Sequence, residues 1–188
     1  MNLANRFTLI RLFLTPIFVL AVLYHREGNL LLANLPLIIF LIAISTDAID
    51  GFIARRYGQT TRFGAVLDPL ADKFLLIVAF ITLTFAKTIP PYFRIPPWVL
   101  IIVFTRDIFI LTGASIIYMT LEYIEFKPSA LGKIATFLQM MTILAVLLRF
   151  SHSYVIWTGA AIFTVLSGIQ YLARANRVLN ETTTYGRK

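Results

Sequence analysis

Long apolar stretches separated by short polar segments recur along the whole chain. A helix that crosses the hydrocarbon core of a membrane needs about 20 largely apolar residues. Stretches of about this length lie at 8–24, 32–49, 69–88, 97–120, 131–149 and 153–173, the first of them interrupted by Arg11 and Pro16. We find no internal repeat and no linker. The pattern predicts an all-α fold, an integral membrane bundle of six transmembrane helices that forms a single domain over residues 1–188.

The composition agrees with a membrane protein. Of the 188 residues 59% are hydrophobic, and the mean hydropathy is +0.81, which a soluble core of this size cannot accommodate. The chain has no cysteine, which excludes disulfides, thiolate metal sites and thiol nucleophiles. We interpret the net charge of +8 as basic loops that face anionic headgroups or anionic substrates, and we expect no nucleic-acid partner.

Lysine and arginine are distributed unevenly between the two sides of the predicted bundle. Four lie on one side, Arg26, Lys87, Arg94 and Arg149, and Arg106 lies inside the fourth span. The other twelve lie on the opposite side, and they are Arg6, Arg11, Arg55, Arg56, Arg62, Lys73, Lys127, Lys133, Arg174, Arg177, Arg187 and Lys188. Because basic loops stay in the cytoplasm, both termini and the loop after the second span are predicted to be cytoplasmic, in the cell (inner) membrane.

Four of the nine acidic residues lie in one 26-residue run around that loop. Asp47 and Asp50 are spaced i, i+3, and Asp68 and Asp72 are spaced i, i+4, so each pair is expected on one helix face. Carboxylates gathered near a membrane surface repel one another unless a cation lies between them. As hard oxygen ligands they suit Mg²⁺ or Mn²⁺, and two such ions can clamp a diphosphate.

Other residues of the run also suit a phosphate ligand. Gly51 leaves no side chain between the helix backbone and a ligand, and Ala54 is small for the same reason. Arg55 can fork onto a phosphate. Gly64 is expected to let the loop turn before the third span. The alternative is that the acids only form surface ion pairs with the arginines of the run.

The run reads Asp-x2-Asp-Gly-x2-Ala-Arg-x8-Gly-x3-Asp-x3-Asp, and this order and spacing resemble the signature of the CDP-alcohol phosphotransferase family. The length and the six predicted spans fit as well, so the resemblance covers essentially the whole chain. It implies an enzyme of phospholipid biosynthesis in a membrane of lipids, with CDP-diacylglycerol as donor, an alcohol acceptor and two Mg²⁺ or Mn²⁺ ions. It also implies a homodimer.

The resemblance further implies roles for single residues. Asp47, Asp50 and Asp68 would bind metal, and Asp72 would lie near or on the second metal. Asp72 would also take the proton from the acceptor hydroxyl, which attacks the phosphorus on the diacylglycerol side and expels CMP. Residues at family positions that hold the cytidine diphosphate moiety are Gly51, Ala54, Arg55, Thr61 and Gly64.

The N-terminal segment contains Asn5, Thr8 and Arg11, and this Asn-x2-Thr-x2-Arg pattern resembles the opening of many phosphatidylglycerophosphate synthases of the family. Asn5 and Thr8 can cap the first helix and also meet a phosphate of the donor, and Arg11 is a candidate for the acceptor. The alternative is plain capping with a positive-inside anchor.

Two later segments bear on the acceptor. Arg106 is an intramembrane arginine and therefore a functional candidate, the alternative being a structural ion pair with Asp107 or a motif aspartate. Because adjacent helical residues do not face each other, we expect Arg106 to be freer of Asp107 than their adjacency suggests. Lys133, Thr136 and Gln139 are expected on one face of the fifth span, although Lys133 can instead snorkel to the headgroups.

Arg106, Lys133 and Thr136 are thus predicted to form a cationic pocket for an acceptor that carries a phosphate. The resemblance favours glycerol-3-phosphate, giving phosphatidylglycerophosphate and CMP. Those synthases usually have Arg-Glu where this chain has Arg106-Asp107, and an Arg-Asp pair also resembles the cardiolipin synthases of the family, whose acceptor is phosphatidylglycerol. Inositol phosphate and serine are less favoured. From another class, a small divalent-cation transporter would use the same acids, but it should carry them near the midplane.

Overall fold

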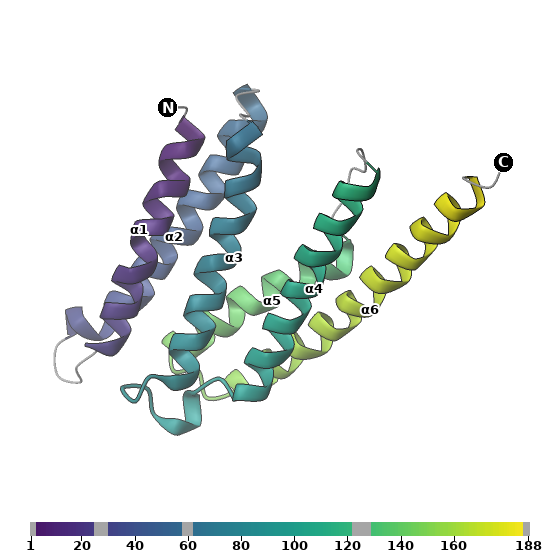
Figure 1. Cartoon of the computed structure of the whole chain (residues 1–188). Coiled ribbons are helices and arrows are strands. Elements are labelled where there is room, and N and C mark those ends of the chain that lie inside the picture. The colour runs from purple at the N-terminus through teal and green to yellow at the C-terminus, as the bar shows by residue number, and fades with distance from the viewer. Residues whose placement is uncertain (1–2, 25–29, 58–61, 122–128, 186–188) are drawn as a thin grey trace. The chain divides into compact units, whose positions relative to one another are not determined.

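The computed structural model describes residues 3–24, 30–57, 62–121 and 129–185, and the side chains of residues 9–24, 33–46, 73–112 and 129–174. In these parts the chain is helical and contains no strand (Figure 1). The elements are α1 (Leu3–Leu23), α2 (Leu30–Tyr57), α3 (Arg62–Phe85), the short 3-10 helix η1 (Pro91–Phe93), α4 (Pro97–Leu121), α5 (Ala130–Leu147) and α6 (Ser153–Tyr185). The prediction of an all-α fold is confirmed.

The helices form two compact units. Unit 1 consists of Met1–Ile95 and Ile143–Ser151, and it holds α1, α2, α3, η1 and the end of α5. Unit 2 consists of Pro96–Thr142 and His152–Lys188, and it holds α4, most of α5 and α6. The single domain over residues 1–188 stays a prediction.

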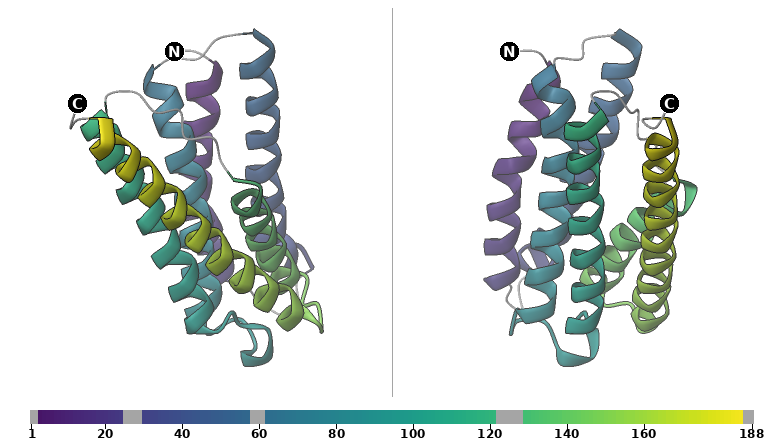
Figure 2. Two further views of the ribbon diagram at one scale, coloured as in Figure 1. Left: turned by 90° about the vertical axis from the view of Figure 1, so that its right-hand side faces the viewer. Right: turned by 45° about the vertical axis from the view of Figure 1, so that its right-hand side comes forward.

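In unit 1, α1 packs against both α2 and α3. The rings of Phe18 in α1 and Phe40 in α2 are buried with their centroids 5.9 Å apart, and Phe80 of α3 is buried as well. Helix α2 runs antiparallel to α1 and α3 (Figure 1 and Figure 2). The C-terminal end of α2 and the beginning of α3 therefore lie at the same end of unit 1 as the beginning of α1.

Helix α1 continues through Pro16 despite the interruption of its apolar pattern. Proline has no N–H to donate, so a proline within a helix leaves a backbone carbonyl without its usual partner. The hydroxyl of the preceding residue, Thr15, donates a hydrogen bond of 2.9 Å to the backbone oxygen of Arg11.

The two helices that carry the aspartate run are longer than the hydropathy pattern predicts. Helix α2 continues to Tyr57 instead of ending near residue 49, and α3 begins at Arg62 instead of near residue 69. Gly64 consequently lies inside α3, and the prediction that the loop turns at this glycine is wrong. The apolar residues from Phe63 to Leu67 extend the helix, which keeps the backbone groups hydrogen-bonded within it.

In unit 2, α4 packs against α6. The rings of Trp98 and Trp157 meet edge to face near the first turns of the two helices, with 5.4 Å between their centroids. Figure 2 shows α4 and α6 extending past the first turn of the shorter α5. The beginning of α5 therefore lies beside the middle of its two neighbours.

Within the described residues, three stretches are long and apolar enough to cross a membrane: Pro91–Thr112, Ala130–Leu147 and Ser153–Arg174. Shorter apolar helical stretches cover Leu9–Leu23, Ala33–Thr46 and Lys73–Phe85. Large apolar side chains on these helices are exposed, as expected for surfaces that face lipid. The chain is therefore membrane-associated, whereas the count of six spans stays a prediction.

Candidate functional site

The four predicted metal ligands lie on two antiparallel helices of unit 1. Asp47 and Asp50 belong to the C-terminal half of α2, and Asp68 and Asp72 to the N-terminal half of α3. These halves lie at the same end of unit 1 (Figure 1). The four side chains are outside the described residues, whose own side chains contain no group of acids and histidines that could hold a metal. Four carboxylates at one end of a helix unit would provide a donor set that suits hard divalent cations.

The residues predicted to hold the donor nucleotide occupy the same end of unit 1. Gly51, Ala54 and Arg55 follow Asp50 on α2, and Gly64 lies near the beginning of α3. Asn5 and Thr8 lie in the first turns of α1. Thr61 is outside the described residues, as are the side chains of the others. Their roles stay predictions.

Arg106 is a buried cation of unit 2, with 9% of its side chain exposed. Its Nη1 donates a hydrogen bond of 2.8 Å to Asp107 Oδ1, and its Nη2 donates one of 2.7 Å to Ser167 Oγ on α6. The Nε atom is buried and has no hydrogen-bond partner among the described residues. The guanidinium is thus held by groups on two helices, while its Nε–H has no partner among the described residues.

Arg106 is less free of Asp107 than the helix spacing suggests, and the alternative of an ion pair between them is observed. Neighbouring helical residues point in different directions, but the arginine side chain is long enough to fold back to the next carboxylate. Both groups are buried, with Asp107 only 2% exposed. Because an uncompensated buried charge is strongly destabilising, the pair forms in spite of its unfavourable spacing.

The first turn of α5 lies directly against this guanidinium. Ser129 caps the helix, since the backbone N–H of Gly132 donates to its Oγ (3.0 Å) and that of Lys133 to its carbonyl oxygen (3.1 Å). A Cβ placed on Gly132 would lie 3.0 Å from Arg106 Nη2. A guanidinium and the positive end of a helix dipole therefore lie together, an arrangement that favours a bound anion.

Lys133 and Gln139 do not share a face of α5, contrary to the sequence prediction. Lys133 is exposed, Thr136 is half-buried and Gln139 is fully buried. Because each step of three residues turns the helix about 60° short of a full turn, two steps separate the first and last residue by about 120°. Gln139 Nε2 donates to Thr164 Oγ1 (3.1 Å), and the Thr136 hydroxyl donates to the Gly132 backbone oxygen (3.1 Å).

Arg11, the remaining residue predicted to bind the acceptor, belongs to unit 1. Its side chain on α1 is almost completely buried, with 1% exposed. A buried arginine in an apolar helix is held in place by polar or charged neighbours. A role for Arg11, Lys133 or Thr136 in binding the acceptor stays a prediction.

A cavity of about 390 Å³ opens between α4 and α6 beside Arg106. Its wall is mainly apolar, with Arg106 and Thr164 among its few polar residues. The other lining residues are Ile101, Ile102, Thr105, Phe109, Ile110, Val165, Gly168, Ile169, Tyr171 and Leu172. The Tyr171 hydroxyl donates to the backbone oxygen of Ile110 at 3.2 Å. This volume is in the range of pockets that hold small ligands, about 300–1,000 Å³.

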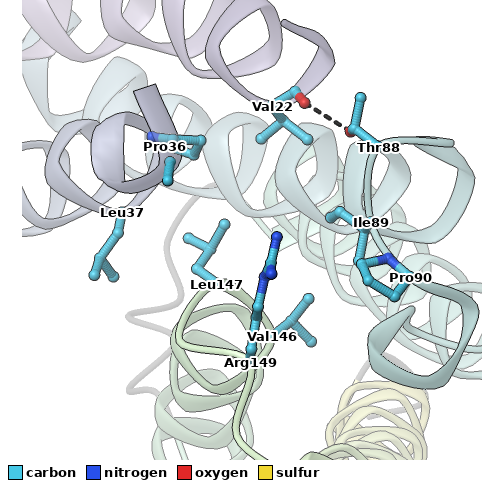
Figure 3. A pocket seen from close by; sticks show the side chains of 10 residues that line it. Val22, Pro36, Leu37, Thr88, Ile89, Pro90, Val146, Leu147 and Arg149 are labelled. Atoms are coloured by element: carbon cyan, nitrogen blue, oxygen red, sulfur yellow. Dashed lines mark hydrogen bonds between the residues drawn. The ribbon is translucent and has the colours of Figure 1, made fainter. Parts of the chain in front are cut away.

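A second pocket lies at the end of unit 1 opposite to the aspartates, where α1, α3 and α5 end (Figure 3). Its volume of about 30 Å³ is room for roughly one water molecule. Figure 3 shows the Arg149 side chain pointing into it from the end of α5, between Leu147 and Ile89. The pocket is too small for a substrate.

Sequence reasoning missed two serines of the polar cluster around Arg106. Ser129 had a usable signal, because a serine directly before an apolar run is a typical helix cap. Ser167 had none, because a single serine within an apolar span is equally compatible with a hydroxyl bonded to its own helix.

The profile of the CDP-alcohol phosphatidyltransferase family matches residues 1–166. A probable phosphatidylglycerophosphate synthase of Mycobacterium tuberculosis is 34% identical over 94% of this chain and 82% of its own length. A CDP-diacylglycerol–glycerol-3-phosphate 3-phosphatidyltransferase of Bacillus subtilis is 34% identical over 92% of this chain and 94% of its own. One of Yersinia pestis is 35% identical over 93% and 95%, respectively.

Proposed function

Because the chain belongs to the CDP-alcohol phosphatidyltransferase family, we propose that it transfers a phosphatidyl group from CDP-diacylglycerol to glycerol-3-phosphate, giving phosphatidylglycerophosphate and CMP. The names of the bacterial relatives point to this donor and acceptor. The main structural support for this reaction is that the two helix halves bearing all four aspartates lie at one end of unit 1 (Figure 1). The same relatives are named as synthases or transferases, which disfavours the cation transporter.

Asp47, Asp50, Asp68 and Asp72 would hold two Mg²⁺ or Mn²⁺ ions. When bound, these ions would neutralise the diphosphate of the donor and stabilise the oxygen that leaves with CMP. The four carboxylates fit this task because they are hard donors, two on α2 and two on α3, at the same end of unit 1. Donor residues on the same helix ends would hold the nucleotide: Gly51, Ala54, Arg55, Gly64, Asn5 and Thr8, with Thr61 between the helices.

Asp72 would act as the base. The proton of the acceptor hydroxyl passes to its carboxylate, and the acceptor oxygen forms a bond to the phosphorus that carries diacylglycerol. The bond from that phosphorus to the bridging oxygen breaks, and CMP leaves with the electron pair. Because a carboxylate near cations is a weak base, positioning of the acceptor must supply part of the rate.

Arg106 would bind the phosphate of the acceptor, together with Lys133, Thr136 and Arg11. Its guanidinium lies against the first turn of α5 and keeps a buried N–H without a partner among the described residues. An anion placed there would meet both the guanidinium and the helix dipole.

A second candidate acceptor is phosphatidylglycerol. The observation that favours it is the mainly apolar cavity of about 390 Å³ beside Arg106, which offers space for an acyl chain next to the site for the phosphate.

An acceptor panel tests the reaction. Purified protein receives CDP-diacylglycerol and Mg²⁺ or Mn²⁺ with glycerol-3-phosphate, phosphatidylglycerol, inositol phosphate or serine, and CMP release is followed. We expect CMP release that depends on glycerol-3-phosphate. CMP release only with phosphatidylglycerol would select phosphatidylglycerol as the acceptor. Absence of acceptor-dependent release across the panel would refute the proposal that the protein is a phosphatidyltransferase.

The arrangement in the membrane is part of the proposal. Six spans would place both termini and the aspartate-bearing helix ends in the cytoplasm, and the protein would be a homodimer in the cell membrane. The chain has no cysteine, so single cysteines can be introduced on a clean background. Gln59→Cys should react with an impermeant thiol reagent only from the cytoplasmic side, and Lys87→Cys only from the other. Labelling of both from one side would contradict this topology.

A further inference from the structure

Three helices of unit 2 meet at the guanidinium of Arg106. Helix α4 provides the arginine and Asp107, α6 provides Ser167, and α5 provides Gly132. The bonds to Asp107 and Ser167 occupy one nitrogen each, and because a guanidinium is planar and rigid, two bonds to different groups fix its plane. The orientation of the guanidinium is therefore set by residues that need not touch a substrate themselves.

Gly132 provides space and not a special backbone conformation. It lies within α5, and its φ is not in the left-handed region where glycine is favoured. A Cβ at this position would lie 3.0 Å from Arg106 Nη2, 3.1 Å from Ser129 Oγ and 3.4 Å from Ser167 Oγ. Alanine is the better helix former, so helix propensity does not explain glycine here. What explains it is the close approach of the guanidinium.

We propose that Gly132 and Ser167 are positioning residues for the acceptor, which hold the Arg106 guanidinium against the first turn of α5 so that it can bind the acceptor phosphate. This proposal rests on the proposed function, in which Arg106 binds that phosphate. Ser167 fixes the guanidinium from α6 through its bond to Nη2. Gly132 admits it to the end of the helix where the dipole is positive.

A methyl group at Gly132 would force the guanidinium to shift by a few tenths of an ångström and would strain its hydrogen bond to Ser167, because Nη2 is the atom nearest to the added carbon. The substitution should weaken binding of the acceptor and leave binding of the donor unchanged. The acceptor would lose charged hydrogen bonds that are each worth about tenfold or more in binding. The donor nucleotide is assigned to helix ends in unit 1, which do not include these residues.

The test compares Gly132→Ala and Ser167→Ala with the control Gly159→Ala. Gly159 lies in α6 of the same unit, and a Cβ there would meet no atom within 4 Å. We expect the KM for glycerol-3-phosphate to rise about tenfold in both test variants, with the KM for CDP-diacylglycerol unchanged. Gly159→Ala should behave as wild type. A purely structural role would instead lower the folded yield or change both KM values together.

A double variant shows whether Gly132 acts through Arg106. In an Arg106→Ala background, Gly132→Ala should not raise the KM for glycerol-3-phosphate further, because the group that it displaces is already absent. Additive effects, or an unchanged KM in both Gly132→Ala and Ser167→Ala, would overturn the proposal while the proposed function stands. If Gly132→Ala does not fold, the KM for glycerol-3-phosphate is compared between Ser167→Ala and the conservative variant Ser167→Thr. The positioning role then predicts a raised KM in Ser167→Ala only.

Measurements on the wild-type protein distinguish a failure of the proposed function from a failure of the positioning role. If it releases CMP with another acceptor from the panel and not with glycerol-3-phosphate, the proposed function fails. The same variants are then measured with that acceptor. A selective rise of its KM supports the positioning role, and an unchanged KM refutes it.

Discussion

Arg106 Nη2 donates a hydrogen bond of 2.7 Å to the Ser167 hydroxyl, and this bond joins the middle of α4 to the middle of α6. The same guanidinium bonds Asp107 through Nη1. An arginine in an apolar span is thereby neutralised within its own helix and oriented by the neighbouring one. Its charge is accommodated in the membrane, and its direction is fixed toward the first turn of α5.

Loss of the carboxylate should destabilise unit 2. Asp107→Ala leaves the Arg106 guanidinium buried without its counter-charge, which is expected to lower the free energy of unfolding by about 3 kcal/mol. Thermal unfolding in detergent measures this as a lower midpoint. The control is Arg106→Met with Asp107→Ala, in which both charges are absent and most of the stability should return. If the double variant loses as much free energy of unfolding as the two single variants lose together, the buried pair is contradicted.

Asp72→Asn should abolish turnover. The amide cannot accept the proton of the acceptor hydroxyl, and general-base catalysis contributes about 10²–10⁴-fold. CMP release is measured together with gel filtration, which should show the variant folded as wild type. Activity close to wild type would exclude Asp72 as the base.

Removal of divalent cations should stop the reaction reversibly. Treatment with a chelator is expected to abolish CMP release, and addition of Mg²⁺ or Mn²⁺ to restore it. Ca²⁺ should not restore it, because it takes more ligands at longer distances than a site built for Mg²⁺ provides. Full activity in excess chelator would refute the metal-dependent mechanism.

The end of α5 offers a stability test away from the site. Arg149 has a φ of 52°, and its N–H and that of Phe150 bond the backbone oxygens of Val146 and Ala145 in the pattern of a Schellman motif. Arg149→Gly and Arg149→Ala both remove the side chain, but only glycine relieves the left-handed conformation. Glycine should therefore be the more stable variant by about 1 kcal/mol in thermal unfolding. Equal stability would contradict the left-handed backbone.

The sequence predicted the helices well and their ends poorly. Asp47 and Asp50 lower the local hydropathy, so the second span was expected to end near residue 49, whereas α2 continues to Tyr57. Hydropathy reports where a chain can lie in lipid, and a helix continues beyond that point as long as its backbone groups bond within it. The aspartate run is thus mostly helical, although its composition resembles a loop.

The surroundings of Arg106 show what a linear pattern cannot give. The arginine was predicted as a candidate because charge within an apolar span is rare. Its partner Ser167 is 61 positions away on another helix, a contact set by how α4 packs on α6. Gly132 has no signal in the sequence, because the need for space at a glycine becomes visible only once its neighbours are placed.

The length of α6 has a consequence for the C-terminus. Its stretch Ser153–Arg174 is long and apolar enough to cross the membrane, yet the helix continues to Tyr185. At 1.5 Å per residue, the further eleven residues extend about 16 Å beyond Arg174. If Ser153–Arg174 spans the membrane, this extension would carry the end of the helix out of the hydrocarbon core and past the headgroup layer. A tag fused there would stand clear of the bilayer.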